Sequence, residues 1–169
     1  MTNTVSPNNI VFAKVHPQAI IPSKRLEDGA FDIYACFDED HVVIKPHETQ
    51  LIPTGLASAF STDYVAILKE RGSTGSKGMG LRCGVVDSGY RGQWFVALTN
   101  HNDIPLIITK TEEMCNVVSN LAIVYPYSKA IAQCVMVQVP RLETVEMPYE
   151  ELLKFESERG TGALGSSNK

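Results

Sequence analysis

Short apolar runs separated by turn-forming residues recur along most of the chain. The runs are rich in Val, Ile and aromatic residues, and Pro, Asn, Asp and Gly stand between them, a pattern that predicts β-strands. Many short strands joined by turns are typical of a barrel or sandwich rather than of alternating strand–helix units. The predicted strands are residues 10–15, 42–44, 50–56, 64–68, 94–99, 106–109, 121–125 and 132–139.

Helical patterns are confined to two places. Residues 73–79 have room for one turn of helix, and residues 149–155 (YEELLKF) have an amphipathic pattern suited to covering one end of the core. The chain contains no internal repeat and no linker, so we expect residues 1–169 to form a single all-β domain. Residues 159–169 (RGTGALGSSNK) are rich in Gly and Ser, and their position alone favours a frayed tail over an arm that orders on a ligand.

Composition limits the classes of function. The chain has 169 residues, 44% of them hydrophobic and 20% charged, which fits one globular domain with one core. A net charge of −4 argues against a broad nucleic-acid surface, which needs a basic stripe, but it allows one anionic small molecule held by local donors. The N-terminal stretch is polar and no apolar run is long enough to span a membrane, so we expect a cytoplasmic protein.

The four cysteines are Cys36, Cys83, Cys115 and Cys134. They form no C-x-x-C pair and have no His at zinc-finger spacing, so we interpret them as free, mostly buried thiols in a reducing compartment. The four histidines are scattered, and no metal site built from side-chain clusters is expected.

Two glycine-rich segments imitate nucleotide-binding motifs without their context. The glycines of residues 160–165 fit G-x-G-x-x-G, but no helix or βαβ unit follows, and residues 72–78 (GSTGSKG) lack the G-K-[ST] ending of a P-loop. An arginine nevertheless stands directly before the glycines of each segment. It is Arg71 in one segment and Arg159 in the other. Exposed backbone N–H groups beside a guanidinium suit a phosphate, and two such cradles would suit a ligand with several phosphates.

Residues 84–100 (GVVDSGYRGQWFVALTN) predict a β-hairpin, with an Asp-Ser-Gly turn between two apolar strands. Two residues are unusual for a purely structural hairpin. Asp87 ends an apolar run, where it can hold a carboxylate near a pocket, and Tyr90 follows the turn, where its ring can pack on a ligand.

This segment resembles the third motif of the trimeric dUTPase (dUTP pyrophosphatase) family, a pattern close to G-V-I-D-x-x-Y-x-G. Four other segments resemble the remaining family motifs in the family's order, and the ordered set is far more specific than any one of them. They are residues 28–35 (DGAFDIYA), 71–78, 130–135 (AIAQCV) and 159–167. A phage-type or Gram-positive bacterial member would fit this pattern.

The resemblance implies a jelly-roll-like distorted β-barrel with a short helix and a mobile C-terminal arm, assembled as a homotrimer. Each active site would use all three subunits, and residues 159–169 would close over a neighbour's site, which reverses the preference for a frayed tail. The implied reaction is hydrolysis of dUTP to dUMP and pyrophosphate by water attack at the α-phosphorus, with Mg²⁺ carried by the phosphates. It limits uracil in DNA and supplies the dTMP precursor.

The resemblance also implies roles around the hairpin. Asp87 would activate and orient the attacking water, the alternative being an Asp that only caps the turn. Tyr90 would lie against the deoxyribose and leave no room for a 2′-hydroxyl. Backbone groups of residues 83–86, which include Gly84, Val85 and Val86, would read uracil, and Phe95 would line the same pocket.

At the phosphates, the resemblance places Arg71, Gly72, Ser73 and Gln133, the last near the α-phosphate. Arg159 matches the family's γ-phosphate arginine, whose planar fork suits phosphate. Asp32 would steady the waters of the metal or hold a neighbouring arginine. The remaining arm residues expected at the substrate are Leu164, Gly165, Ser166 and Ser167.

Three departures from the family pattern affect this expectation. Leu164 stands where the family has a Phe that stacks on uracil, and Trp94 or Phe95 would have to supply the ring. Gly72 replaces a serine, which removes a hydroxyl from the phosphates. Residues 101–129 are longer than in compact members, and form either a surface hairpin or a contact for a partner protein, as similar insertions in phage-type members suggest.

Two alternatives compete with dUTP hydrolysis. A dCTP deaminase shares the fold but has a Glu ten residues after the hairpin Asp, and this Glu transfers protons at the cytosine ring. Here that position is Ala97, which has no carboxylate to transfer protons. A non-catalytic nucleotide-binding or regulatory protein is favoured by Gly72 and Leu164, whereas Asp87, Gln133 and Arg159 oppose it.

Overall fold

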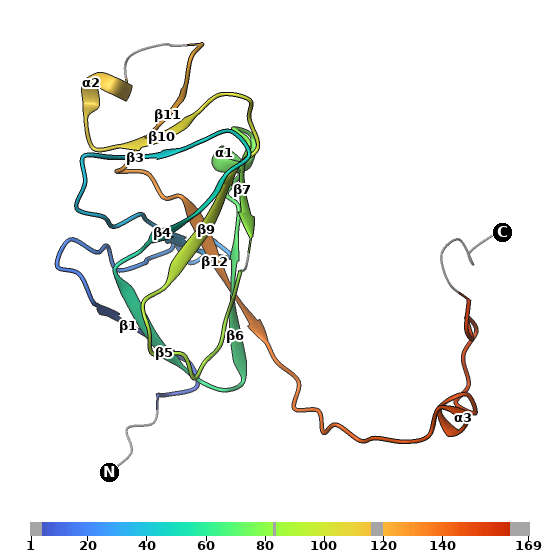
Figure 1. The fold of residues 1–169 in the computed structure, drawn as a ribbon. Helices are drawn as coiled ribbons and strands as arrows, with labels where there is room; N and C mark the ends of the chain where they lie inside the picture. The colour runs from blue at the N-terminus through green and yellow to red at the C-terminus, as the bar shows by residue number, and fades with distance from the viewer. Residues whose placement is uncertain (1–4, 83, 116–119, 163–169) are drawn as a thin grey trace.

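The computed structural model describes residues 5–82, 84–115 and 120–162. Its regular elements are mostly short strands, with one-turn helices between or after them (Figure 1). The strands are β1 (Ile10–Lys14), β2 (Phe31–Ile33), β3 (His41–Ile44), β4 (Thr49–Pro53), β5 (Leu56–Phe60), β6 (Tyr64–Lys69), β7 (Met79–Arg82), β8 (Val85–Val86), β9 (Phe95–Asn100), β10 (Leu106–Thr109), β11 (Ile123–Pro126) and β12 (Ala132–Gln138). The helices are α1 (Gly72–Gly75), α2 (Glu112–Cys115) and α3 (Tyr149–Leu152).

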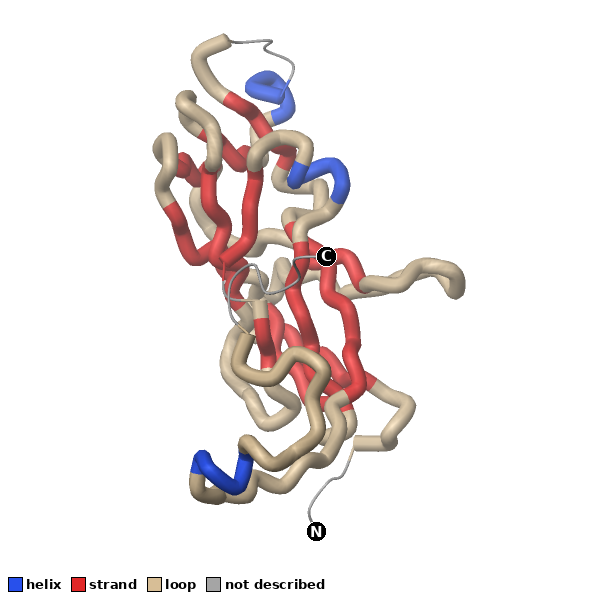
Figure 2. The backbone as a smooth tube through the Cα atoms, turned by 90° about the vertical axis from the view of Figure 1, so that its right-hand side faces the viewer, coloured by secondary structure: helices blue, strands red, loops and turns tan. Residues whose placement is uncertain are grey.

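The strands pair into small sheets that wrap around one core. Their orders are β1-β5, β11-β10-β3, β2-β12-β6-β8 and β4-β9-β7. Strands distant in sequence lie side by side in both views of the chain, as in a jelly roll (Figures 1 and 2). The predicted all-β, jelly-roll-like class is confirmed, and among the described residues the sheets stay open rather than closing into a barrel.

The core is a single large cluster of apolar side chains between the sheets, with Trp94, Tyr125, Ile33 and Leu98 among its fully buried members. β9 is the central strand of its sheet, between β4 and β7, and it is buried from Val96 to Asn100. Burying such side chains stabilises the fold by about 1.5–3 kcal/mol each. This core fixes the strand ends from which the candidate site is built.

Most predicted strands are present within one or two residues of their expected bounds, but residues 50–56 are split between β4 and β5. Gly55 lies between them with a φ of 66°. A Cβ there would lie 2.8 Å from Cys36 Sγ and 2.9 Å from Ala19 Cβ, so only glycine fits this turn. Cys36 and Cys134 are free, buried thiols, as expected.

The segment 101–129 is not the surface hairpin that we considered. β10 and β11 pair in parallel, with Leu106 opposite Ile123, and β3 pairs with the other edge of β10. Parallel neighbours need a crossover connection rather than a tight turn. α2 lies in that crossover, so the segment adds an integral layer to the sheet.

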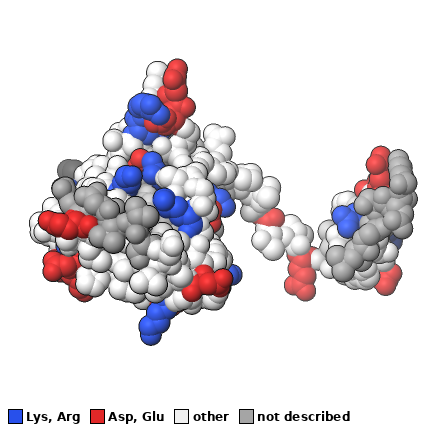
Figure 3. All heavy atoms as spheres, turned by 90° about the horizontal axis from the view of Figure 1, so that it is seen from above, with Lys and Arg blue, Asp and Glu red and all other residues white. Residues whose placement is uncertain are grey.

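The C-terminal segment leaves the body after β12 and carries α3 away from it (Figure 1). No residue of α3 is buried, so the expectation that residues 149–155 cover one end of the core is wrong within this chain. From above, basic and acidic side chains are interspersed on the body and at the far end of this arm (Figure 3). No helix in the described ranges is long and apolar enough to cross a membrane.

Candidate active site

Residues 84–100 do not form the paired hairpin that their sequence predicts. β8 pairs with β6, with Val85 opposite Ile67, whereas β9 pairs with β4 and β7. The turn itself is present, because the Tyr90 amide donates to the Asp87 carbonyl at 3.1 Å. The turn therefore carries the chain from the edge of one sheet into another sheet, and a cleft opens between them.

This Asp87 cleft has a volume of about 290 Å³. Its walls are mainly apolar, and Asp87 is the one acidic side chain that lines it in the described part of the chain. The lining residues are Leu51, Val85, Val86, Asp87, Tyr90, Gln93, Trp94, Phe95 and Ala97. The structure thus brings together the five residues from Val85 to Phe95 that the sequence analysis assigned to one pocket.

The ring of Tyr90 is held against its own turn. Its hydroxyl donates to the Gln93 carbonyl at 3.0 Å, and the ring lies so close to Gly92 that a Cβ there would be 2.6 Å from Tyr90 Cζ. Gly92 therefore lets the ring lie flat beside the cleft, and 45% of the Tyr90 side chain is still exposed for a ligand.

β8 offers an unpaired backbone edge to the same cleft. The Leu68 amide donates to the Gly84 carbonyl at 2.7 Å, which makes these residues a hydrogen-bonded pair. Because such pairs alternate along antiparallel strands, the N–H and C=O of Val85 point away from β6. An N–H donor beside a C=O acceptor can form two hydrogen bonds with the edge of a ligand ring that contains an amide group. Cys83, also expected to contribute, lies outside the described residues.

Trp94 and Phe95 differ sharply in what they offer a ligand. Trp94 is 1% exposed and packs edge-to-face on Phe12, with ring centroids 5.5 Å apart, so it belongs to the core and is not available to stack on a ligand. Phe95 is 43% exposed. Of the two rings considered in place of the arm's missing Phe, Phe95 is the one on the cleft surface.

A second cleft, of about 440 Å³, lies around Arg71. It is strongly polar and collects residues from the loop before β2, the start of α1 and β12. The lining residues are Ser23, Arg25, Asp28, Gly29, Ala30, Asp32, Arg71, Gly72, Ser73 and Gln133. The first, second and fourth motifs therefore meet in this Arg71 cleft.

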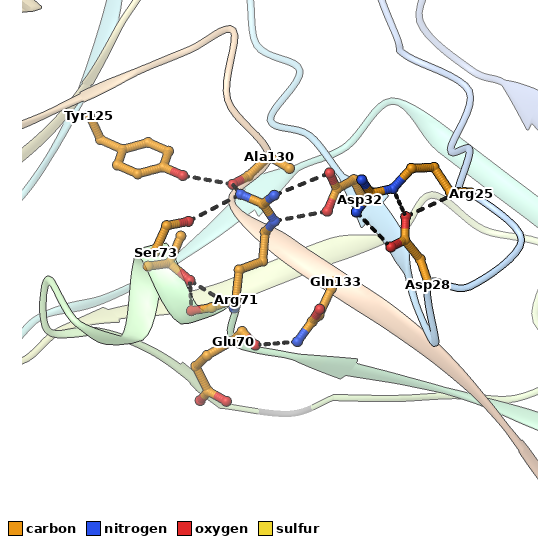
Figure 4. A network of polar contacts seen from close by, with 10 residues as sticks. Arg25, Asp28, Asp32, Glu70, Arg71, Ser73, Tyr125, Ala130 and Gln133 are labelled. Atoms are coloured by element: carbon orange, nitrogen blue, oxygen red, sulfur yellow. Dashed lines mark hydrogen bonds and ion pairs between the residues drawn. The ribbon is translucent and has the colours of Figure 1, made fainter.

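Arg71 is held by Asp32 in a bidentate pair (Figure 4). Its Nε and Nη2 donate to the two Asp32 oxygens at 2.8 and 3.2 Å, and its Nη1 donates to Ser73 Oγ at 3.1 Å. Of the two roles considered for Asp32, this is the contact with a neighbouring arginine. Ser73 receives that bond and keeps its own O–H available as a donor.

The backbone around Arg71 is locked by Thr74. The Arg71 amide donates to Thr74 Oγ1 at 2.9 Å, and that hydroxyl donates to the Arg71 carbonyl at 3.0 Å. Thr74 is fully buried, which anchors the first turn of α1. A Cβ on Gly72 would meet nothing within 4 Å, so packing does not explain the glycine at this position.

Gln133 faces the cleft from β12. Its Nε2 donates to the Glu70 carbonyl at 2.7 Å, which leaves its second amide N–H for a ligand. Glu70 in turn accepts the Leu81 amide at 2.8 Å, and this hydrogen bond lowers the pKa of Glu70. Sequence reasoning missed Glu70, because its role depends on strand pairing.

Arg25 is a second guanidinium in the Arg71 cleft that the motif comparison did not identify. Its Nε and Nη2 donate to the Asp28 carboxylate at 3.0 and 2.9 Å (Figure 4). Hydrogen bonding by Arg25 lowers the pKa of Asp28 and raises that of Arg25. Within the described residues its Nη1 has no protein partner, so Arg25 has more donors free for an anion than Arg71.

The two clefts lie apart within one chain and share no lining residue. Continuing the β6–β8 register by one residue places Asp87 opposite Val65, and Arg71 follows Val65 by six positions. At roughly 3.3 Å per residue, this is a separation of about 20 Å along the strand. Gln133 pairs with Lys69 on the far side of β6, about 13 Å along the same direction from Asp87.

The arm is far from both clefts in this chain. Arg159 is exposed, and its Nε donates to the Gly162 carbonyl at 2.9 Å. Leu164, Gly165, Ser166 and Ser167 lie outside the described residues. The chain therefore brings the predicted site residues together in two groups and leaves the described part of the arm away from both.

Comparison with known proteins gives a consistent result. The dUTPase family model matches residues 16–123. The deoxyuridine 5′-triphosphate nucleotidohydrolase of Nautilia profundicola is 33% identical over 92% of this chain and 96% of its own length. That of Neisseria meningitidis serogroup C is 33% identical over 87% of each chain.

Solved structures with the same fold come from staphylococcal phages. The dUTPase of Staphylococcus bacteriophage 80alpha with dUPNHPP has a TM-score of 0.68 at 22% identity, covering 96% of this chain and 99% of its own. A variant of the dUTPase from phage phi11 of S. aureus, solved to show the coordination of a structural Mg(II) ion, has a TM-score of 0.63 at 21% identity. It covers 83% of this chain and 98% of its own.

Proposed function

The chain belongs to the dUTPase family and is a dUTP diphosphatase, and we propose that it hydrolyses dUTP in sites assembled from more than one copy of the chain. The observation that carries this proposal is the Asp87 cleft, where one carboxylate stands beside an aromatic ring and an open backbone edge. Removal of dUTP limits uracil in DNA, and the dUMP product is the precursor of dTMP.

The separation of the two clefts supports a shared site. Asp87 and Gln133 are both expected at the α-phosphorus, yet β8 and β12 lie on opposite sides of β6. One small substrate cannot contact both groups of a single chain. If the Asp87 cleft of one copy faces the Arg71 cleft of another, both groups meet one substrate, and a homotrimer closes this head-to-tail contact into a ring.

In the Asp87 cleft, the backbone edge at Val85 would read uracil, because its N–H and C=O match the alternating acceptor and donor of that base. Phe95 would cover the base from the side. Tyr90, fixed over Gly92, would pack on the deoxyribose, where a 2′-hydroxyl would collide with its ring. The cleft would thus select both the base and the sugar.

Asp87 would accept a proton from a water molecule and direct it at the α-phosphorus. The water oxygen forms a bond to phosphorus, the bond to the oxygen that bridges to the β-phosphorus breaks, and pyrophosphate leaves. The free N–H of Gln133 and the hydroxyl of Ser73 would stabilise the negative charge on the phosphate oxygens. Arg71 would mainly position Ser73, since Asp32, Ser73 and the Ala130 carbonyl together accept most of its N–H donors.

Magnesium fits the charge balance of the Arg71 cleft. Its two arginines and two aspartates cancel, so a bound triphosphate needs additional positive charge. Arg159 from an arm would supply part of it at the γ-phosphate. Mg²⁺ bound on the phosphates would supply the rest and withdraw electron density from phosphorus, and Asp28 and Asp32 are the carboxylates present to receive its water ligands.

The deaminase alternative is not favoured. Ala97 is 4% exposed and forms part of the Asp87 cleft wall, at the position where a deaminase would need its second acid.

We also propose that the enzyme works in the cytoplasm, where the buried thiols of Cys36 and Cys134 stay reduced.

A pyrophosphate-release assay with dUTP, dCTP, dTTP and UTP tests the function. We expect release confined to dUTP, because the cleft selects uracil and excludes a 2′-hydroxyl. Ammonia released from dCTP would instead establish the deaminase, and nucleotide binding without turnover would establish a binding protein.

A further inference from the structure

The tip of the turn that carries Asp87 is open. A Cβ on Gly89, at this tip, would meet nothing within 4 Å. One hydrogen bond closes the turn, from the Tyr90 amide to the Asp87 carbonyl at 3.1 Å. Among the described residues, no donor contacts the Asp87 carboxylate, so its position depends on the backbone of the turn. A carboxylate that must meet one water molecule therefore needs a further restraint on this backbone.

Arg91 supplies such a restraint from the end of the turn. Its Nη1 donates to the Ser88 carbonyl at 2.6 Å and to the Tyr90 carbonyl at 3.1 Å. The same nitrogen donates to the Ser58 carbonyl at 3.3 Å. Hydrogen bonds from a guanidinium are charge-assisted and roughly twice as strong as those between neutral groups. One cationic nitrogen thus joins two carbonyls of the turn to a third carbonyl in β5.

The contact with Ser58 ties the turn to the body of the molecule. Ser58 is 5% exposed and lies in β5, opposite Phe12 of β1. Two residues earlier in the same strand, the Leu56 carbonyl accepts the Trp94 amide at 2.7 Å. Carbonyls two residues apart in a strand point to the same side, so both contacts are on one edge of β5. The chain after the Asp87 turn is therefore anchored at two points on a buried strand.

We propose that Arg91 is a positioning residue, which holds the turn against β5 and so keeps the Asp87 carboxylate where water attack on the α-phosphorus needs it. The inference rests on the proposed function for the reaction, but not for the anchoring of the turn. The pattern G-V-I-D-x-x-Y-x-G leaves this position open, so the family resemblance assigns Arg91 no role. Arg91 lines neither cleft, so its effect on the reaction passes through the turn.

Steady-state kinetics with dUTP test the effect on the reaction. Arg91→Met removes the donors and keeps most of the length of the side chain. We expect kcat to fall about 10²-fold, as for a catalytic group displaced by about 1 Å, and KM to change less than about threefold because the cleft walls remain. Arg91→Lys should recover about tenfold of this loss, since its ammonium has three N–H donors for the same carbonyls.

The matched control is Arg141→Met, which should leave both constants unchanged. Arg141 is also an exposed arginine, it is paired with Asp63 at 2.8 Å, and it lines neither cleft.

Hydrogen exchange of the ligand-free protein tests the anchoring without relying on catalysis. Mass spectrometry of peptides that span residues 86–93 reports the Tyr90 amide, which is protected by its bond to the Asp87 carbonyl. We expect Arg91→Met to speed exchange there by about tenfold, because the turn opens more often. Exchange in peptides of β12 should stay unchanged, which shows that the variant is folded, and Arg141→Met should match the unmodified protein in both places.

Unchanged exchange in residues 86–93, or a fall in kcat no greater than that of Arg141→Met, would overturn the proposal. A rise in KM larger than the fall in kcat would also overturn it, because Arg91 would then be a substrate-binding residue. If the unmodified protein does not hydrolyse dUTP, the proposed function fails, while hydrogen exchange still decides whether Arg91 anchors the turn.

Discussion

At the scale of single residues, the two clefts divide the chemistry between them. The Asp87 cleft offers one carboxylate among apolar walls, and the Arg71 cleft offers paired charges and hydrogen-bond donors. The sequence identified Asp87, Tyr90 and Arg71 because their motifs are local. It could not identify Arg25, because this side chain joins the Arg71 cleft only when the loop before β2 folds beside α1 and β12.

Replacing Asp87 by Asn keeps the shape of the side chain and removes its ability to accept a proton. We expect turnover of dUTP to fall by about 10³-fold, in line with the loss of a general base. Binding of dUTP, measured by calorimetry, should change little because the cleft walls remain. A variant that retains a near-normal rate would show that Asp87 only caps its turn.

Arg25→Ala removes the guanidinium with the most donors free for the phosphates. We expect KM for dUTP to rise about tenfold with a smaller effect on kcat, since charge-assisted hydrogen bonds to the ground-state phosphates are lost. Arg141→Ala is the matched control, because Arg141 is also an exposed arginine paired with an aspartate, Asp63, at 2.8 Å, but lines neither cleft. Equal effects of the two substitutions would contradict a specific role for Arg25.

At the scale of elements, local pattern predicted most strands and failed where pairing is non-local. β10 is a continuous run of apolar and β-branched residues, β12 is mainly apolar, and both lie where expected. β7 (MGLR) has little strand propensity and forms because β9 pairs with it. The hairpin expected at 84–100 is absent for the same reason, since β6 and β4 outcompete the local partner.

The close approach of β8 to β6 gives a test of this packing. A Cβ on Gly84 would lie 2.5 Å from the Leu68 carbonyl oxygen, so Gly84→Ala must push β8 away from β6. We expect a loss of about 1–3 kcal/mol in unfolding free energy, measured by urea denaturation, together with weaker dUTP binding. Gly89→Ala, in the turn that follows β8 and with nothing within 4 Å of the added Cβ, should be nearly neutral. Two equally stable variants would argue against the predicted contact.

The parallel β10–β11 pair is an element whose purpose the sequence did not reveal. It replaces the expected surface hairpin by a layer that joins β3. A role of residues 101–129 in a contact with a partner protein stays a prediction.

At the scale of the whole molecule, the account depends on copies of the chain completing one another. Each copy carries an Asp87 cleft, an Arg71 cleft and an arm, and none of the three meets the others within the described chain. A closed head-to-tail assembly would bring one of each to every site. The sequence suggested sites shared between copies only through family resemblance. The separation of the two clefts within one chain gives a physical reason for such sharing.

The most direct test of this claim is complementation between two impaired variants, each of which lacks a side chain of a different cleft. Asp87→Asn chains and Arg71→Ala chains, co-expressed in equal amounts, should regain about a quarter of the unmodified pyrophosphate release from dUTP. A shared site draws its Asp87 side from an intact chain half of the time and its Arg71 side half of the time, in random assembly. Activity no higher than that of the two variants measured separately would show that each site lies within one chain and would contradict the account.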